Sequence, residues 1–386
     1  MNEGYEAEVR HQTLLVHKVP FVSSDRIVKY GTLACPYVVD AVGNVSPPEN
    51  HQVWWSDETP CYANGQQLKA ILFSENPHEL IPGLNVRWQF SNKPTDLANF
   101  SDHYSKMVHY ICHLSDQARA IDQTADARTG RVIEQMETGS VFRYADTASA
   151  RAEIVAVSQR LATQKIAIIG LGGTGSYVLD QVAKTPVLEI HLFDADIFEQ
   201  HNAFRAPGAA SAEDLRERLC KVEFFKRRYE PMRCSIFTHD YFITEANVSE
   251  LDVFDFVFVC VDKGSARRTI TSYLKKQGVA FVDVGMAIEL VSGSSTLAGM
   301  CRATLVTADS NSHIEETIPM MDGEQDALYG SNIQIADMNM LNAALAVIQW
   351  KQFSGFYQDD FGTHHLAYTV NSQSLARSVQ IKAELE

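Results

Sequence analysis

The sequence predicts an α/β fold: a Rossmann-like, doubly wound and mostly parallel sheet, preceded by a smaller α+β domain. Three observations support this prediction. In the second half of the 386-residue chain, short apolar segments alternate with helical patterns, as in parallel sheets that helices cover on both faces. One of these segments runs into a glycine-rich turn that opens a helix. The first half instead carries short β-rich runs between turn signals.

The N-terminal half, residues 1–138, is predicted to be an α+β domain of unknown function. Turn-forming pairs such as Asn64-Gly65 separate its β-rich runs. Apolar residues spaced as on one helix face then follow over 101–114. A polar stretch around 123–139 is the best linker, and it precedes a second domain over residues 139–386.

The second domain is predicted to consist of alternating strands and helices. Short, continuously apolar runs that alternate with helical patterns indicate the strands of a covered parallel sheet. A last helix is apolar over most of its surface and is interpreted as packing, not as a ligand site. In chain order, these elements are a helix over 148–161, a strand over 165–170, a helix over 175–185, a strand over 187–194, a helix over 214–230, a strand over 255–262, a helix over 264–276, a strand over 279–285 and a helix over 336–350.

Composition and charge exclude several protein classes. Hydrophobic residues at 45% and charged residues at 21% are typical of soluble globular proteins and argue against a disordered or fibrous chain. The net charge of −15 argues against binding to nucleic-acid backbone or to an anionic membrane surface. No apolar stretch reaches the roughly 20 residues of a membrane span. Seven cysteines without a CxxC pair, and a glutamate-rich start that does not fit a secretory signal, predict a cytoplasmic protein.

A nucleotide site is predicted where the first strand of the second domain ends. Gly170, Gly172 and Gly175 fit the GxGxxG pattern in its required context of strand, tight turn and helix start. Glycine lets the backbone approach phosphate there, and the helix N-terminus offers unpaired N–H groups and the positive end of a dipole. Asp194 follows Gly175 by 19 residues and ends the next strand, the usual place for an acidic residue that binds ribose. Up to this point the pattern fits NAD as well as ATP.

The residues around this turn form an ordered set that is more specific than GxGxxG. Residues 170–176 read GxGGxGS, and residues 194–205 read DxDxxxxxNxxR. Lys221 follows in a helical pattern, and Asp262 follows a buried strand. Over residues 140–350, this set resembles the ThiF/MoeB/HesA superfamily, the adenylating module of ubiquitin-activating enzymes.

The resemblance implies an enzyme that uses ATP and Mg²⁺ to adenylate the C-terminal glycine carboxylate of a ubiquitin-like or sulfur-carrier protein, with release of pyrophosphate. Such catalysis is mostly positioning and neutralisation of charge on phosphoryl oxygens. The implied catalytic residues are Arg205 and Lys221, which neutralise the triphosphate, Asn202, which orients phosphate oxygens, and Asp262, which holds Mg²⁺. The residues implied to hold the nucleotide are Gly170, Gly172, Gly173, Gly175, Ser176, Asp194 and Asp196, together with Arg205 and Lys221.

Ordinary structural roles stay open for the charged residues of this set. Arg205 and Lys221 also fit a solvated basic face, because several Lys and Arg residues surround them in sequence, and Asp262 also fits a helix cap. The chain departs from the family in having Ala206 after Arg205, and in spacing Lys221 16 residues beyond Arg205. The resemblance also implies a homodimer, in which an arginine from a preceding helix, often of the partner subunit, reaches ATP. The residues considered for that role are Arg143 and Arg151.

A thiol for a second, thioester-forming step is missing from residues 308–332, where single-module relatives carry it when they have one. The N-terminal half resembles, less specifically, an uncharacterised Cys/His domain fused to ThiF modules in bacterial operons with ubiquitin-like proteins. Cys61, between a proline and a turn, is expected to be accessible, and a nearby histidine such as His51 would make it nucleophilic. Cys35 is the weaker alternative, and both also fit ordinary structural residues. Thioester capture would add a conjugating-enzyme-like partner.

Two other functions remain open on the sequence. An NAD-dependent oxidoreductase shares the glycine turn, although Gly173, Asn202 and Arg205 speak against it. A catalytically inactive adaptor that binds a ubiquitin-like protein shares the fold, although the complete set of charged residues speaks against it. The charge distribution adds an expectation about the partner. Residues 303–340 hold seven acidic residues and no Lys or Arg, so this segment would steer a basic ubiquitin-like protein.

Overall fold

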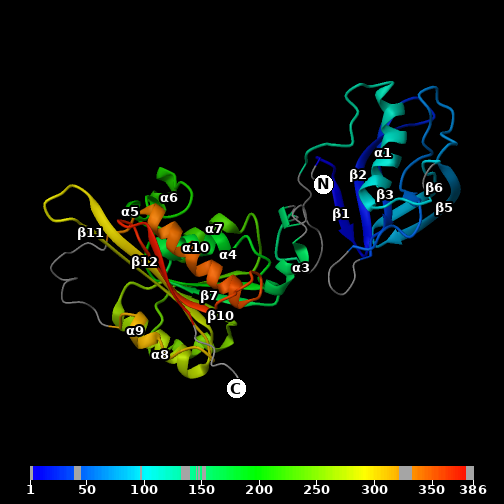
Figure 1. Ribbon diagram of the computed structural model, residues 1–386. Coiled ribbons are helices and arrows are strands. Elements are labelled where there is room, and N and C mark those ends of the chain that lie inside the picture. Colours follow the sequence, from blue (N-terminus) through cyan, green and yellow to red (C-terminus); the bar gives the residue numbers. More distant parts are fainter. Residues whose placement is uncertain are drawn as a thin grey trace, which may run out of the picture. The chain divides into compact units, whose positions relative to one another are not determined.

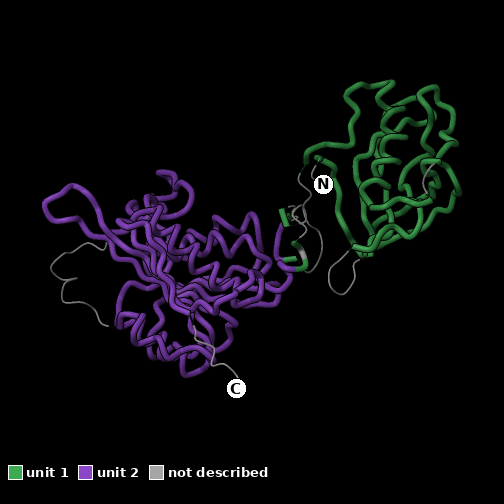
Figure 2. Tube along the Cα trace, in the orientation of Figure 1, with its two compact units in different colours: residues 1–140, 144–156 green, residues 141–143, 157–386 purple. Residues whose placement is uncertain are grey.

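The computed structural model describes residues 3–38, 45–95, 98–131, 140–144, 146, 148–149, 154–320 and 333–379. The chain falls into two compact units (Figure 2). The N-terminal unit comprises Met1–Ser140 and Tyr144–Ala156, and the C-terminal unit comprises Val141–Arg143 and Val157–Glu386. The boundary predicted at residue 138 lies within 132–139, outside the described residues.

The N-terminal unit is an antiparallel sheet with one long helix packed on it (Figure 1). Helix α1, His103–Arg119, begins where the Asp102 side chain accepts a hydrogen bond from the Ser105 amide at 2.7 Å, which satisfies one of the free N–H groups of a helix start. The helix packs on β2 and continues past the predicted end at residue 114. The strands lie in the order β1-β2-β3-β4-β6-β5, with the bounds Ala7–Arg10 (β1), Thr13–Val22 (β2), Val28–Pro36 (β3), Gln52–Trp55 (β4), Leu72–Ile81 (β5) and Leu84–Ser91 (β6).

Large aromatic side chains fill the space between this sheet and α1. Trp55 is fully buried, and its ring meets Phe21 edge to face at 5.1 Å and stacks on Phe90 at 5.9 Å. Tyr110 of α1 enters the same core and donates to the His51 carbonyl at 2.6 Å, so its buried hydroxyl is satisfied. A cavity in place of such a ring costs about 3–5 kcal/mol. This aromatic cluster therefore holds α1 on the sheet.

The C-terminal unit is built on one eight-stranded sheet whose strands change from parallel to antiparallel partway across (Figure 1). Every pairing from β9 to β11 is parallel, and every pairing from β11 to β14 is antiparallel. Successive connections leave β7 first toward β8 and later toward β10, and ligands of such sheets bind at this switch point, beyond the carboxyl ends of the strands. The order is β14-β13-β12-β11-β10-β7-β8-β9, with the bounds Lys165–Ile169 (β7), Glu189–Phe193 (β8), Ile236–His239 (β9), Phe256–Val259 (β10), Phe281–Leu290 (β11), Leu297–Val306 (β12), Thr363–Thr369 (β13) and Ser374–Val379 (β14).

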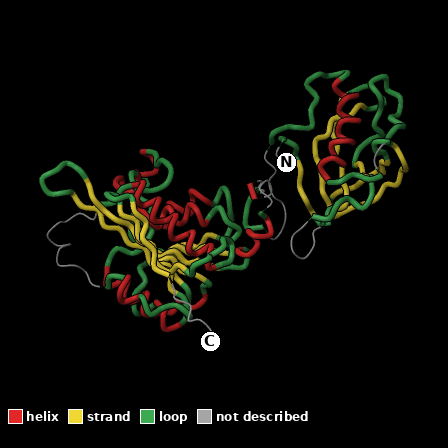
Figure 3. The backbone as a smooth tube through the Cα atoms, in the orientation of Figure 1, coloured by secondary structure: helices red, strands yellow, loops and turns green. Residues whose placement is uncertain are grey.

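Helices cover both faces of this sheet (Figure 3), which confirms the doubly wound fold predicted from the sequence. Helices α4, α7 and α10 bury one apolar cluster, and α8, α9 and the 3₁₀ helix η2 bury the other. Within the described ranges, no helix is both long and apolar enough to cross a membrane. The bounds are Val155–Ser158 (α3), Gln159–Leu161 (η1), Gly173–Val182 (α4), Gln200–Ala203 (α5), Ala212–Arg216 (α6), Lys221–Tyr229 (α7), Val248–Val253 (η2), Gly264–Gln277 (α8), Ile314–Thr317 (α9) and Ala336–Phe353 (α10).

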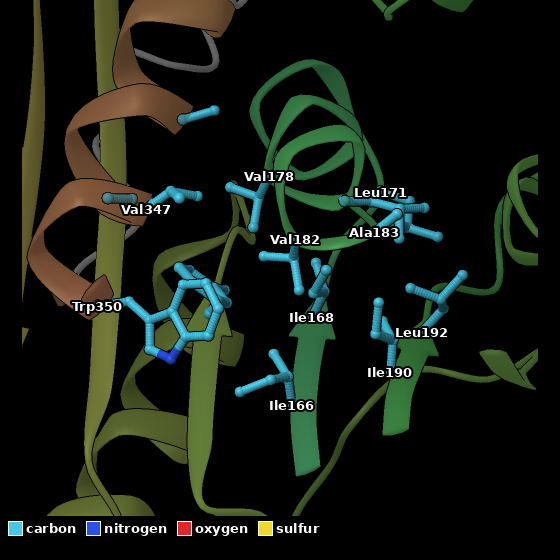
Figure 4. Close-up of a cluster of buried hydrophobic side chains, with 14 of the residues drawn as sticks. Ile166, Ile168, Leu171, Val178, Val182, Ala183, Ile190, Leu192, Val347 and Trp350 are labelled. Atoms are coloured by element: carbon cyan, nitrogen blue, oxygen red, sulfur yellow. The ribbon is translucent and has the colours of Figure 1, made fainter. Parts of the chain in front are cut away.

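The larger core lies between β7, β8 and the helices α4 and α10 (Figure 4). Because alternate residues of a strand point to opposite faces, Ile166 and Ile168 of β7 enter this core, while Ala167 and Ile169 enter the cluster on the other face. Trp350 of α10 is fully buried in the same core. Each fully buried isoleucine contributes roughly 1.5–3 kcal/mol. Packing on both faces thus fixes the strand that leads into the glycine turn.

Strand β10 lies at the centre of the sheet, between β7 and β11, and all four of its side chains are fully buried. Phe256 and Phe258 enter the cluster beneath α4 and α10, and Val257 and Val259 enter the cluster beneath α8. The chain then reaches Asp262, which directly precedes the N-cap of α8. Both cores of the unit therefore hold the strand that carries this carboxylate.

Two predicted helices differ from the structure. The range 214–230 overlaps two short helices, α6 and α7, because Arg218 between them adopts a left-handed backbone with a φ of 52° that interrupts the helix. The range 148–161 contributes α3 and η1 at its end, while residues 150–153 lie outside the described part. Strand β11 continues past the predicted end at residue 285, because its second half pairs with β12.

Candidate functional site

The glycine turn between β7 and α4 begins at Gly170, whose φ of 89° lies in the left-handed region that favours glycine. Its N–H donates to the Phe193 carbonyl at 2.8 Å, which joins the turn to the end of β8. A side chain at Gly170 would meet the Cys260 carbonyl, just beyond β10. Gly170 is therefore fixed where the ends of three strands converge.

The other glycines of the turn meet different neighbours. A methyl group at Gly175 would overlap the Gly170 carbonyl, and one at Gly173 would overlap the Asn339 side chain. At Gly172, the N-cap of α4, no atom of the described residues lies within 4 Å of the place that a methyl group would take. Three glycines are thus required by packing, whereas Gly172 borders open space at the N-terminus of a ten-residue helix, where an anion is favoured.

Asp194 and Ser176 hold the turn in place. The buried Asp194 carboxylate accepts hydrogen bonds from the Leu171 amide at 2.6 Å and from the Asp196 amide at 2.9 Å. Burial raises the pKa of Asp194, and the nearby Lys221 ammonium opposes that rise. The buried Ser176 hydroxyl donates to the Gly173 carbonyl at 2.8 Å. Ser176 was expected to hold the nucleotide, but its hydroxyl points back into the turn and braces it.

Lys221 is a buried cation between two carboxylates. It is the first residue of α7, and its side chain is 8% exposed. Its ammonium lies 2.6 Å from Asp196 Oδ2 and 3.6 Å from Asp194 Oδ1, while its backbone N–H donates to the Asp196 carbonyl at 2.8 Å. A residue of a solvated basic face would be exposed, so this burial rules out that alternative for Lys221. The DxD segment and Lys221 form one cluster beside the glycine turn.

Two nitrogen donors near this cluster are buried without hydrogen-bond partners among the described residues: Asn202 Nδ2 and Arg205 Nε. The other end of the Asn202 amide is occupied, because its Oδ1 accepts from the Glu199 amide at 2.9 Å in a capping box that starts α5. Burial lowers the pKa of Arg205, and the carboxylates of Asp262 and Asp196 act against that shift. Since buried polar groups are nearly always paired, the two free donors indicate a missing acceptor. Phosphate oxygens fit this requirement.

Asp262 is exposed and lies close enough to Arg205 to affect its pKa. In the described part of the chain, no group of three or more His, Cys, Asp or Glu side chains could hold a metal ion. A lone exposed carboxylate such as Asp262 is compatible with Mg²⁺, because this ion is usually bound by one or two carboxylates together with water and substrate phosphates.

Helix α10 brings residues to the site that the sequence analysis missed. Asn339 is fully buried, and its Oδ1 accepts a hydrogen bond from the Thr174 hydroxyl at 3.1 Å. Its Nδ2 donates to the Arg205 carbonyl at 3.5 Å. Just before the helix, Gln334 Oε1 accepts from the Gly173 amide at 3.3 Å. The interpretation of this helix as packing is confirmed for its apolar side chains, and its first turn adds hydrogen bonds to the glycine turn that were not expected. The available signal was an asparagine in a helix that is otherwise largely apolar.

Cys61 was expected to be accessible, and this expectation was wrong. The residue is 2% exposed, because its backbone bridges to both Val22 and Gln67 and draws the side chain into a small apolar cluster. Burial, with the nearby Glu58, raises the pKa of the thiol. The alternative, Cys35, is fully buried and its pKa is raised to about 11. Both thiols are therefore poor nucleophiles, because the thiolate is the reactive form.

Of the two arginines considered for a distant contact to ATP, only Arg143 lies in the described part of the chain, and its hydrogen bonds go to residues outside this cluster. Arg143 belongs to a short segment of the C-terminal unit, where its N–H donates to the Met232 carbonyl at 2.9 Å and its guanidinium donates to the Glu230 carbonyl. Arg151 lies outside the described residues.

Comparison with known proteins finds similarity on both sides of residue 147. Residues 146–347 match the ThiF family, and residues 1–147 match a domain of unknown function (DUF6791). Ubiquitin-like modifier-activating enzyme 5 of Drosophila virilis is 26% identical over 178 residues, which are 42% of this chain and 44% of that protein. The same enzyme of Branchiostoma floridae is 28% identical over 156 residues, which are 37% and 38% of the two chains. The chain thus spans less than half the length of these curated relatives.

Solved structures align with a larger share of the chain but less closely. A crystal structure of E. coli MccB with MccA-N7isoASN is 18% identical, covers 61% of this chain and 70% of that chain, and gives a TM-score of 0.48. A crystal structure of PaaA is 16% identical, covers 72% of this chain and 92% of that chain, and gives a TM-score of 0.46.

Proposed function

The chain belongs to the ThiF family, and from this premise we propose that it binds ATP and adenylates the C-terminal carboxylate of a small protein. The substrate we propose is a ubiquitin-like or sulfur-carrier protein that ends in glycine. The curated relatives named above are activating enzymes for ubiquitin-like modifiers, which supports this class of substrate. The proposal concerns the C-terminal unit, because the family match begins near the end of the N-terminal unit.

The observation that carries the proposal is the pair of buried, unpaired donors, Asn202 Nδ2 and Arg205 Nε. They come from one short segment, and Asp262 and Asp196 lie close enough to influence Arg205. Among the described residues, no atom lies within 4 Å of the side-chain position of Gly172 at the start of α4. A triphosphate would supply the missing acceptors and would be stabilised by the helix N-terminus.

In the proposed reaction, a carboxylate oxygen of the protein substrate forms a bond to the α-phosphorus of ATP. The bond from that phosphorus to the oxygen that bridges to the β-phosphate breaks, and pyrophosphate leaves with the electron pair. Negative charge accumulates on phosphoryl oxygens, and fixed donors that need no reorganisation stabilise it best. Arg205 and Lys221 supply positive charge, and the free Asn202 amide orients a phosphate oxygen. Asp262 would hold Mg²⁺, which neutralises charge on the leaving phosphates.

Thioester capture on Cys61 is not part of this proposal, because that thiol is buried and its pKa is raised. We propose instead that the reaction of this chain ends at the adenylate, or that a second protein supplies the thiol. A conjugating-enzyme-like partner and a homodimer remain part of the proposal on the strength of the family resemblance. A cytoplasmic location remains part of it because the seven cysteines show no CxxC pair.

The acidic charge near α9 and α10 supports a basic protein partner. Glu315 and Glu316 of α9 and Asp337 of α10 are exposed, whereas three of the acidic residues in the predicted segment, Asp322, Glu324 and Asp326, lie outside the described residues. Charge of one sign speeds the encounter with a partner of the other sign and is screened by salt. We therefore expect the association rate with the protein substrate to fall as ionic strength rises. A salt-independent association rate would remove this part of the proposal.

The test is exchange of radioactive pyrophosphate into ATP by the purified full chain, with and without a glycine-ended ubiquitin-like protein. We expect exchange that depends on that protein. Arg205→Ala should lower the exchange rate at least about 100-fold, because losing one fixed donor to developing charge typically costs that much. Asp262→Ala should have a similar effect through the metal. Arg216→Ala is the matched control, since Arg216 is exposed and pairs with Glu213 at the surface.

Two outcomes would contradict the proposal. A chain that binds the glycine-ended protein without any exchange would be the inactive adaptor considered above. Exchange that survives in the Arg205→Ala variant would remove Arg205 from the catalytic set and leave its unpaired donor unexplained.

A further inference from the structure

Asn339 touches both halves of the proposed phosphate site, although it lies far from them in sequence. It is separated from Thr174 by 165 residues and from Arg205 by 134 residues. Its side chain is fully buried within the first turn of α10, and among the described residues its amide bonds only to these two partners. The helix packs along α4, so the two helices are held together where α4 begins.

The two ends of the Asn339 amide serve different segments. The oxygen accepts from the Thr174 hydroxyl at 3.1 Å and thereby holds the first turn of α4. The nitrogen donates to the Arg205 carbonyl at 3.5 Å and thereby holds the turn that presents the Arg205 guanidinium. Among side chains of this size, only a primary amide has a donor and an acceptor at fixed separation, since a carboxylate only accepts and leucine does neither.

The Asn339 side chain occupies the space in which a side chain at position 173 would lie, so this position must be glycine. A methyl group at Gly173 would overlap the Asn339 carboxamide nitrogen, carbon and oxygen, whereas a methyl group at Gly172 would meet no atom of the described residues within 4 Å. The usual reason for a glycine in such a turn is close approach of the backbone to phosphate. At Gly173 the structure gives another reason, because the space on its side-chain face is already filled by Asn339.

We propose that Asn339 is a positioning residue that holds the glycine turn and the Arg205 turn in the geometry that binds the triphosphate, and that the chain requires glycine at 173 in order to admit the Asn339 amide. This inference rests on the proposed function, since it assigns the role of Asn339 within the ATP site. Asn339 acts through Thr174 and Arg205 and is not placed in contact with the nucleotide.

The test measures the Kd for ATP by calorimetry on the full chain, together with the melting temperature of each variant. Asn339→Ala should weaken ATP binding about 10-fold, which corresponds to the coupling of about 1.4 kcal/mol that is typical of contacting groups. Asn342→Ala is the matched control: Asn342 is also fully buried in α10, but its side chain donates to the Gly285 carbonyl at 3.1 Å, away from the glycine turn. The control should lower the melting temperature by a similar amount and leave the Kd unchanged.

The decisive comparison is Gly173→Ala in two backgrounds. In the wild-type chain, Gly173→Ala should weaken ATP binding about 100-fold or more, because the overlap with Asn339 breaks the amide's hydrogen bonds and also shifts the backbone of the glycine turn. In the Asn339→Ala chain, the same change should weaken binding by less than about 3-fold, because the space is free. Such dependence on background is the signature of residues in direct contact.

Each of three outcomes would overturn one claim: the role of Asn339, the reason for glycine at 173, or ATP binding itself. Equal Kd values for the wild type and Asn339→Ala would overturn the positioning role of Asn339. The same loss from Gly173→Ala in both backgrounds would show that Gly173 serves the phosphate directly, and the size argument would fail. A wild-type chain that binds no ATP at all would overturn the proposed function itself.

Discussion

Both units of the chain contain buried residues of types that can take part in catalysis. The two units differ in whether these residues keep a group that is free to interact with a ligand. In the N-terminal unit, Cys35 and Cys61 are enclosed in apolar clusters, and burial raises the pKa of each thiol. In the C-terminal unit, Asn202 and Arg205 are partly enclosed as well, yet each keeps a buried donor without a partner in the described structure. Burial alone therefore does not mark a functional group. The two unpaired donors come from one short segment near the glycine turn and are available to bond an acceptor, whereas burial suppresses ionisation of the two thiols, as is typical of core residues.

The sharpest test within the C-terminal unit compares Gly175→Ala with Gly172→Ala. A methyl group at Gly175 would overlap the Gly170 carbonyl, so we expect a loss of folding free energy of at least about 1–3 kcal/mol from overpacking. A methyl group at Gly172 meets no atom of the described residues within 4 Å, so we expect only the cost of a weaker N-cap, about 1 kcal/mol or less, because alanine caps a helix less well than glycine. Chemical unfolding measures both changes.

The Gly172→Ala variant also tests the proposed phosphate site, because its effect on ATP binding should be larger than its effect on stability. Gly172→Ala should weaken ATP binding despite a normal fold, because the methyl group occupies the place where phosphate approaches the helix N-terminus. A Gly172→Ala chain with normal stability and normal ATP affinity would show that the open space at Gly172 is not the phosphate site.

A second test compares the two buried thiols of the N-terminal unit with two exposed thiols, one in each unit. Cys112 on α1 is exposed, as is Cys234 in the other unit, whereas Cys35 and Cys61 are buried. We expect iodoacetamide to modify Cys112 and Cys234 in the folded chain and to spare the buried pair, as read by mass spectrometry. Cys61→Ser should leave pyrophosphate exchange within about 2-fold of the wild type, since the proposed adenylation does not use this buried thiol. Rapid alkylation of Cys61 in the folded chain would reopen its role as an acyl carrier.

The smallest expected effect concerns pH. His191 and His239 lie with ring nitrogens 2.9 Å apart on neighbouring strands, and burial lowers the pKa of both. As pH falls below about 6.5, the unfolded chain binds protons before these two histidines do, so folding stability is lost toward acid. We expect a loss of about 1 kcal/mol or less per histidine between pH 7.5 and 5.5.

A matched variant isolates this pH effect. His191→Phe keeps an aromatic ring against Phe237, on which His191 stacks at 4.7 Å. Urea unfolding at the two pH values should show a smaller acid loss in the variant than in the wild type. Equal losses would assign the acid sensitivity to other groups, such as His103 of the N-terminal unit, whose pKa is also lowered by burial.

Sequence patterns predicted the parallel part of the sheet well because its signals are local. The apolar run 165–170 and the glycine turn that follows match β7 and the start of α4 almost residue for residue. The structure also brings Lys221 against Asp194 and Asp196 of the DxD segment, whereas these residues were expected to have separate roles at the nucleotide. Asn339 was missed because its partners lie more than a hundred residues away and no local pattern reports them. Cys61 was misjudged for the same reason: a proline and a turn suggested exposure, while bridges to Val22 and Gln67 bury it.

Strand β10 has a consequence for how the site behaves when the protein fluctuates. Its backbone pairs on both sides, with β7 and β11, and its four side chains are divided between the two cores. Edge strands such as β14, whose residues are all exposed, can separate at little cost. The amide protons of β10, by contrast, should exchange with solvent only when the whole unit unfolds. Asp262 lies three residues beyond this strand. It is therefore attached to a segment that we expect to be among the last to unfold when the C-terminal unit fluctuates.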